Sequence, residues 1–205
     1  MRRSPECEIH PVILKVPPEY LELPVRERVR FLSRYARRAV SESAARAGFR
    51  LTSFPKNENG APLALDGVYW SLTHKPAYVA GVAAPGPIGI DIEEIRSRSE
   101  RLKDRIAGPE EWDLVDAEQP ESFFRYWTAK EAVLKAAGVG LAALSGCRIL
   151  KIMDTHHLVV DFQGQNWTVA HHFFDGHLAS VVRDGYSLRW GILNGIEPDF
   201  GFREF

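Results

Sequence analysis

Apolar residues in the first quarter of the chain recur at intervals of three and four. Between residues 25 and 40 they include Val25, Val29 and Leu32, and arginines fill many of the intervening positions. Residues at this spacing lie on one face of an α-helix, so the pattern predicts an amphipathic helix. Pro24 suits its first turn and Gly48 its end. The other face of this helix is basic, and it is either solvated surface or a face that binds an anion or a partner.

Short apolar segments of strand type lie before and after this helix, at residues 12–16, 67–72, 78–83 and 88–93. In the last of them isoleucines alternate with other residues, so Asp91 and Glu93 share one strand face and the isoleucines share the opposite one. Residues 54–66 are rich in Pro, Asn and Gly, which predicts an ordered loop with turns.

The second half repeats the order of helix and strands. A charged stretch at residues 94–119 predicts one or two short helices, and Pro120 introduces a stronger helical segment that ends near Gly138. Four strand-like segments then predict an antiparallel meander, at residues 148–152, 157–162, 167–173 and 178–182. We expect an α+β fold, and the order of elements allows two similar α+β halves at residues 1–87 and 88–205.

Composition narrows the kind of protein. The chain has 205 residues, 45% of them hydrophobic and 26% charged, as in an ordinary globular protein. A formal net charge of −1 argues against a protein that coats nucleic acid. Cys7 and Cys147 form no CxxC motif and predict neither a disulfide framework nor a thiolate metal site. No segment approaches the roughly 18 apolar residues of a membrane span, so we expect a cytoplasmic enzyme or binding protein.

The acidic strand face suggests a metal site. Two carboxylates brought together repel each other, and Mg²⁺ relieves the repulsion because it takes carboxylate, water and phosphate oxygens as ligands. Asp91 and Glu93 are therefore candidate ligands. The alternative is a solvent-facing strand edge that carries two ordinary acids.

The helix after Pro120 adds a third carboxylate. Glu131 lies in line with Phe124 and Trp127 on the stripe expected to be buried, where an unpaired carboxylate is costly. Lys130 is its neighbour and Lys135 lies one turn further on, so one helix can offer a carboxylate to a metal and ammonium groups to phosphates. The alternative is a salt bridge between Glu131 and Lys135 on a solvated face.

Two further groups of polar residues are less specific. Residues 71–75, Ser-Leu-Thr-His-Lys, read as a small polar turn whose hydroxyl, imidazole and ammonium groups suit an anion, although such a sequence is often only a capped turn. The histidine pairs at 156–157 and 171–172 fall on predicted strands, where neighbouring side chains point to opposite faces. We interpret these pairs as surface and packing residues.

Together these elements resemble a known family. The segments 89–93 (Gly-Ile-Asp-Ile-Glu) and 127–138 (Trp-Thr-Ala-Lys-Glu-Ala-Val-Leu-Lys-Ala-Ala-Gly) resemble the paired signatures of the 4′-phosphopantetheinyl transferase superfamily. Residues 71–74 resemble the upstream Ser/Thr-His element of its surfactin-type branch, and residues 59–62 (Asn-Gly-Ala-Pro) resemble its Gly-Lys-Pro loop.

The resemblance implies a monomeric pseudo-dimer of two α+β halves, each with a helix on an antiparallel sheet, and an active site in the cleft between them. It implies transfer of the phosphopantetheine arm of coenzyme A to a serine of an acyl or peptidyl carrier protein, with release of 3′,5′-adenosine bisphosphate. Such carriers serve fatty acid, polyketide or nonribosomal peptide biosynthesis. No nucleic-acid or membrane partner is expected.

The resemblance also assigns site residues. It implies Asp91, Glu93 and Glu131 as Mg²⁺ ligands, with Asp91, Glu131 and Lys135 catalytic. It implies that coenzyme A is bound by one group of residues: His74, Thr73, Lys130, Lys135, Gly60 and Pro62. Ala61 stands where the family commonly has Lys, so Lys56 or Arg50 is expected to supply that cationic contact.

The implied reaction is attack of the carrier serine on the β-phosphorus of coenzyme A. The serine proton goes either to Glu131 or to a metal-bound water. Two alternatives stay open at this point: a Mg²⁺-dependent phosphohydrolase or nucleotide transferase that uses the same acids, and a non-catalytic carrier-binding module that docks an acidic protein on the basic helix.

Overall fold

The computed structural model describes residues 7–116 and 119–194. Its helices are α1 (Val25–Arg46), α2 (Glu100–Ile106), α3 (Pro109–Trp112) and α4 (Pro120–Ala136), with 3₁₀ turns η1 (Pro18–Tyr20) and η2 (Leu141–Gly146). The strands are β1 (Glu8–Ile9), β2 (Val12–Lys15), β3 (Tyr69–His74), β4 (Tyr78–Ala84), β5 (Ile90–Glu94), β6 (Cys147–Asp154), β7 (His157–Phe162), β8 (Gln165–Phe174), β9 (His177–Val182), β10 (Ser187–Leu188) and β11 (Gly191–Leu193).

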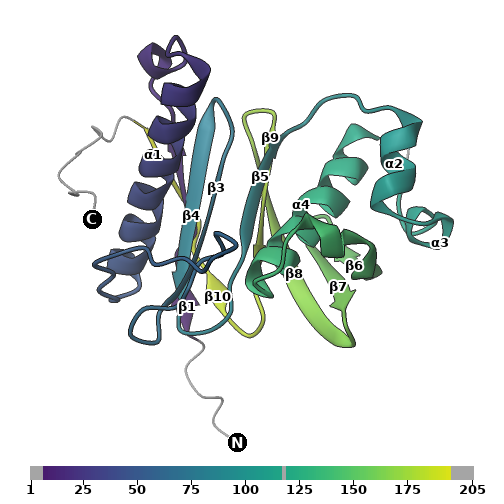
Figure 1. Cartoon of the computed structure of the whole chain (residues 1–205). Helices are drawn as coiled ribbons and strands as arrows, with labels where there is room; N and C mark the ends of the chain where they lie inside the picture. The colour runs from purple at the N-terminus through teal and green to yellow at the C-terminus, as the bar shows by residue number, and fades with distance from the viewer. Residues whose placement is uncertain (1–6, 117–118, 195–205) are drawn as a thin grey trace, which may run out of the picture.

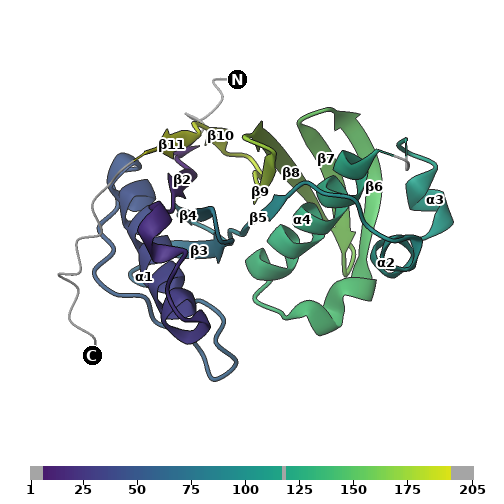
Figure 2. The same cartoon turned by 90° about the horizontal axis from the view of Figure 1, so that it is seen from above.

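Two larger sheets stand side by side, as Figures 1 and 2 show. One has the strand order β11-β2-β4-β3 and the other β5-β9-β8-β7-β6, while β1 and β10 form a short parallel pair. Strand β5 is the edge of the five-stranded sheet that faces the four-stranded one. The largest buried apolar cluster contains side chains of both sheets, among them Val82 of β4 and Ile90 of β5. One core therefore fixes the two sheets against each other.

Helix α1 covers the four-stranded sheet (Figure 1). Phe31, Leu32 and Tyr35 form its buried face and pack in a cluster that includes Leu14 and Val79 of the sheet. The predicted stripe marks this buried face only from Leu32 onward, because Val25 and Val29 in the first turns are 67% and 49% exposed. Burial of the remaining face is the main source of the stability of α1.

Helix α4 covers the five-stranded sheet and lies close against β5. A Cβ added to Gly89 would lie 1.8 Å from the carbonyl oxygen of Ala132 and 2.7 Å from the backbone nitrogen of Ala136. Only a glycine admits this approach, because any side chain would push the helix away. The contact brings the middle of α4, where Glu131 lies, over the carboxylates of β5.

Most of the predicted elements are present, and the predicted α+β class is confirmed. Two expectations need correction. The segment 71–74 is not a turn, because β3 continues to His74. The C-terminal segment also returns to the first sheet, where β11 pairs with β2 in parallel, so a boundary between residues 87 and 88 does not separate the two sheets. Among the described residues no helix is long and apolar enough to cross a membrane.

Candidate active site

Asp91 lies on β5 and points toward the first sheet. Its carboxylate is 5% exposed, and its Oδ1 accepts hydrogen bonds from Thr73 Oγ1 of β3 at 2.9 Å and from Lys135 Nζ of α4 at 2.8 Å. Its Oδ2 is buried and accepts no hydrogen bond from any described residue. A buried carboxylate oxygen without a donor is costly, so this atom marks a place where a further donor or a cation would be stabilising.

Glu93 lies two residues further along the same strand face. Its carboxylate is 8% exposed, and its Oε1 accepts a hydrogen bond from Trp127 Nε1 at 2.9 Å. The same oxygen lies 2.7 Å from Lys75 Nζ. The alternation in the sequence therefore placed both acids correctly on one face, and that face is buried between the two sheets instead of solvated.

Glu131 on α4 completes an acidic group with Asp91 and Glu93. The pKa of Glu131 is raised to about 7, chiefly by burial and then by the nearby charge of Asp91, with a smaller contribution from Glu93 and against the opposing effects of Lys135 and Lys75. The three carboxylates thus lie close enough to destabilise one another's charge.

Cationic groups surround these acids. Lys135 Nζ also donates to the carbonyl oxygen of Ile90 at 3.0 Å. The pKa of His74 is lowered, first by burial and then by Lys135, Lys75 and Lys56. His74 is therefore held neutral beside several positive charges, an environment that favours an anionic ligand.

Lys130 lies elsewhere, and the expectation that it joins Lys135 at a phosphate is wrong. Its side chain is 1% exposed, and its Nζ contacts Glu111 Oε1 at 2.7 Å and donates to the carbonyl oxygen of Ile106 at 2.6 Å. Neighbouring residues on a helix point about 100° apart, so Lys130 cannot follow Glu131 toward β5. Lys130 binds the segment of α2 and α3 to α4.

The predicted adenine loop lies in the connection between α1 and β3. Lys56 forms an isolated β-bridge with Pro62, and Gly60 adopts a positive φ of 77° in the tip. Lys56 is near enough to His74 to lower its pKa, and its own pKa is lowered by burial and by Arg37. Arg50 is exposed just after α1. Among the described residues of this loop and Arg50, Lys56 is the one whose charge acts on the charged cluster, through its effect on the pKa of His74.

The sequence predicts a Mg²⁺ site at these carboxylates. Within residues 7–116 and 119–194, no three His, Cys, Asp or Glu side chains are placed so that they could together hold a metal ion. In this arrangement Lys135 pairs with Asp91, and Lys75 pairs with Glu93. The donors are nevertheless of the kind that a hard cation binds. Oδ2 of Asp91 accepts no hydrogen bond from the described residues, and the pKa of Glu131 is raised by burial and by the charge of Asp91, which a bound cation would offset.

Carboxylates and cations gathered between two sheets are typical of enzymes that bind phosphate groups with a metal. The sequence profile of the 4′-phosphopantetheinyl transferase superfamily matches residues 87–187, from the start of the β5 segment to β10. The chain belongs to this superfamily.

Curated relatives agree with this assignment. The chain is similar to a 4′-phosphopantetheinyl transferase of Bacillus subtilis, with 27% identity over 137 residues, 64% of this chain and 56% of that protein. It is 38% identical to the transferase HetI of Nostoc sp. over 97 residues, 44% of this chain and 41% of HetI. It is 30% identical to the transferase gsp of Aneurinibacillus migulanus over 92 residues, 43% and 39% of the two chains. The matches thus span about two fifths to just over half of these relatives.

The structure brings together six of the polar residues singled out in the sequence: Asp91, Glu93, Glu131, Lys135, Thr73 and His74. The sequence suggested Lys75 only as part of a segment suited to an anion and gave Trp127 no role in the site, whereas both side chains contact Glu93. The signal for Lys75 was present, because it directly follows His74 in a cationic segment. Trp127 gave no such signal, since an aromatic residue on a helix stripe usually means packing.

Proposed function

We propose that this protein transfers the 4′-phosphopantetheine arm of coenzyme A to a serine of an acyl or peptidyl carrier protein and releases 3′,5′-adenosine bisphosphate. The observation that carries the proposal is the meeting of Asp91, Glu131 and Lys135 at one sheet edge in a member of this superfamily. Thr73 contributes from the opposite sheet.

In this proposal the two halves predicted from the sequence, residues 1–87 and 88–205 of a cytoplasmic monomer, form a cleft that holds coenzyme A. Strand β11 belongs to the second of these halves in the sequence, but it pairs with β2 in the first sheet. The burial of Asp91 and Glu93 on β5 supports an active site between the two sheets. Thr73 and Lys75, from the side of the first sheet, contact these two acids there.

Asp91, Glu93 and Glu131 are the residues that would hold Mg²⁺. When bound, Mg²⁺ supplies positive charge that neutralises the pyrophosphate oxygens and the developing charge of the leaving group. This chain's own part is to gather the three carboxylates on a rigid strand and a rigid helix, which keeps their positions fixed during the reaction.

Lys135, His74 and Thr73 would bind the phosphate groups of coenzyme A. Lys135 lies beside Asp91, so it has to turn from this carboxylate to reach a phosphate. The carrier serine then attacks the β-phosphorus, and the bond to the adenosine bisphosphate breaks. Glu131 is the residue of this group proposed to accept the serine proton. Lys56, Gly60, Pro62 and Arg50 are proposed to lie nearer the adenosine end.

The test is incubation of the full chain with coenzyme A, Mg²⁺ and an apo-carrier, followed by intact-mass measurement of the carrier. We expect the carrier to gain one phosphopantetheine group, with 3′,5′-adenosine bisphosphate released only when carrier is present. Release without carrier would instead support a phosphohydrolase. Carrier binding without either product would support a non-catalytic module.

A further inference from the structure

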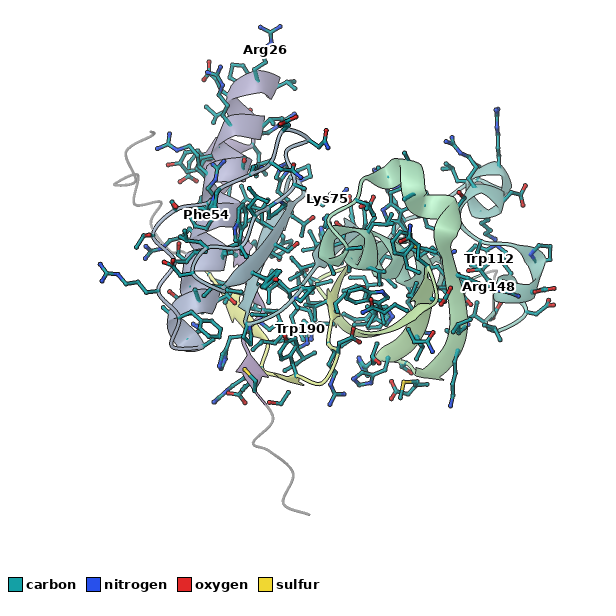
Figure 3. All side chains as sticks on the ribbon, turned by 60° about the horizontal axis from the view of Figure 1, so that its bottom comes forward. Arg26, Phe54, Lys75, Trp112, Arg148 and Trp190 are labelled. Carbon is teal, nitrogen blue, oxygen red and sulfur yellow. The ribbon has the colours of Figure 1, made fainter. Side chains whose placement is uncertain are left out.

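Lys75 occupies a fixed position at the tip of the turn between β3 and β4. Its backbone nitrogen donates to the carbonyl oxygen of Tyr78 at 2.8 Å, which closes the turn. Its side chain reaches across to the other sheet, where Nζ lies 2.7 Å from Oε1 of Glu93 on β5. Figure 3 shows Lys75 between the part of the molecule that carries α1 and helix α4.

The acceptor of this ion pair is well removed from water. The side chain of Glu93 is 10% exposed, whereas that of Lys75 is 33% exposed. The same Oε1 also accepts the indole N–H of Trp127. One oxygen of a carboxylate that is otherwise suited to a metal ion is therefore already held by two donors, and one of them carries a full positive charge.

Lys75 and a divalent ion at Glu93 would oppose each other. An ion bound to this carboxylate would lie close to the ammonium group, and like charges at such separations repel where water is partly excluded. Binding of the ion there is therefore favoured when Lys75 moves away from Glu93. Such a movement is open to Lys75, because a third of its side chain is exposed to solvent.

We propose that Lys75 is an internal cation that competes with a divalent metal ion for Glu93 and so lowers the metal affinity of the site. The inference rests on the proposed function, because it takes Glu93 as one of the metal-binding carboxylates. It adds that binding of the ion frees Lys75 beside His74 and Lys135, so that a positive charge becomes available to an anionic substrate at the same moment.

The test uses Mn²⁺ as the probe and electron paramagnetic resonance of free Mn²⁺ as the readout, with the full chain and no substrate. The variants are Lys75→Met, Lys75→Arg, Glu93→Gln and the double variant Lys75→Met/Glu93→Gln. Lys151→Met removes an exposed positive charge on β6, outside the cluster, and controls for net charge. Thermal unfolding of each variant verifies that it is folded.

We expect Lys75→Met to bind Mn²⁺ about threefold to tenfold more tightly than the parent, a coupling typical of charges in contact. Lys75→Arg keeps the competing charge and should resemble the parent, as should Lys151→Met. In the Glu93→Gln background the loss of Lys75 should change the affinity little, because the contested carboxylate is gone.

Unchanged or weaker Mn²⁺ binding by Lys75→Met would overturn the inference and leave the proposed metal site standing, provided that the parent binds Mn²⁺. An equal gain in the Glu93→Gln background would also overturn it, since the effect would then not pass through Glu93. Absence of Mn²⁺ binding in the parent and every variant would contradict both the inference and the metal site of the proposed function.

Discussion

Two lysines of α4 five residues apart have opposite environments. Lys135 is half-buried beside Asp91 at the sheet edge, whereas Lys130 is fully buried against Glu111. Glu111 is itself held by the backbone nitrogens of Ile149 and Gly108. The first lysine is therefore placed to exchange partners, and the second is part of a closed network.

Substitution of the two lysines should separate these roles. Lys135→Ala should raise the coenzyme A concentration required and alter its salt dependence, because a charge that faces the anion is lost. Lys130→Met should instead lower the free energy of unfolding by about 3 to 5 kcal/mol, since it leaves Glu111 buried without its cation. Calorimetric titration with coenzyme A and urea unfolding of both variants measure the two effects. Unchanged coenzyme A affinity in Lys135→Ala would show that Lys135 only forms a structural ion pair with Asp91.

His171 on β8 should make stability depend on pH. Its Nδ1 shares a hydrogen bond with Ser180 Oγ, and burial lowers the pKa of His171 well below its ordinary value, with further lowering by Arg125, His157 and His156 and an opposing effect of Asp154. Below about pH 6.5 this histidine is protonated in the unfolded chain but stays neutral in the folded protein. The free energy of unfolding should therefore fall by up to about 1.4 kcal/mol per pH unit below that value.

Urea unfolding between pH 7.5 and 5.5 measures this loss, and His171→Gln should flatten the curve. His10→Gln serves as the control. His10 lies beside an exposed acid, Glu8, and not in the buried environment of His171. An equal slope in the parent and in His171→Gln would show that another group carries the pH dependence.

At the scale of elements, the sequence predicts α1, α4 and the meander well because each has a strong period and clear punctuation. Pro24 stands directly before α1, and Pro120 is the first residue of α4. The strands β1, β10 and β11 were not predicted. They have two or three residues each, too few to show a period, and they are defined by partners far away in the chain.

The candidate site was predictable as a set of residue types and less so as a geometry. The alternation in β5 placed Asp91 and Glu93 on one face, and that placement needs only local information. The assignment of Lys130 was wrong because it relied on nearness to Glu131 in the sequence. Which cation meets which acid depends on the packing of α4 on β5 and of β3 beside it, and no single element contains that information.

Gly89 is the residue on which this packing depends. In Gly89→Ala the new methyl group would collide with the backbone of α4 at Ala132, so the helix has to move away from β5. We expect a loss of stability of about 1 to 3 kcal/mol and a larger relative loss of transfer, because Glu131 and Lys135 move with the helix. Gly140→Ala is the matched control, since nothing lies within 4 Å of its added Cβ and its φ is −91°. Equal behaviour of the two variants would contradict this role of Gly89.

On the scale of the whole molecule, charge is unevenly distributed although the net charge is only −1. Residues 25–50 contain eight arginines: Arg26, Arg28, Arg30, Arg34, Arg37, Arg38, Arg46 and Arg50. Arg37 is near enough to Lys56 to lower its pKa, which links α1 to the loop beside the charged cluster. A positive surface next to a site can speed the approach of an acidic carrier more than it raises the final affinity.

Charge reversal at Arg34 and Arg37 should therefore slow carrier modification at low salt and have little effect at high salt. Lys151→Glu, on the far strand β6, controls for the change in net charge. Carrier dependence and coenzyme A dependence are measured separately, because an arginine that binds the 3′-phosphate would change the affinity for coenzyme A itself. If neither dependence responds, the basic face of α1 is solvated surface.

The proposed transfer activity depends on the carboxylates between the sheets. Its most direct test is the rate at which labelled phosphopantetheine passes from coenzyme A to an apo-carrier in the presence of Mg²⁺, compared between the parent, Asp91→Ala and Asp113→Ala. Asp113 is an exposed acid at the end of α3 and serves as the control. We expect Asp91→Ala to remain folded and lose transfer, while Asp113→Ala keeps the parental rate. Modification of the carrier by Asp91→Ala at the parental rate would contradict this role of the carboxylates.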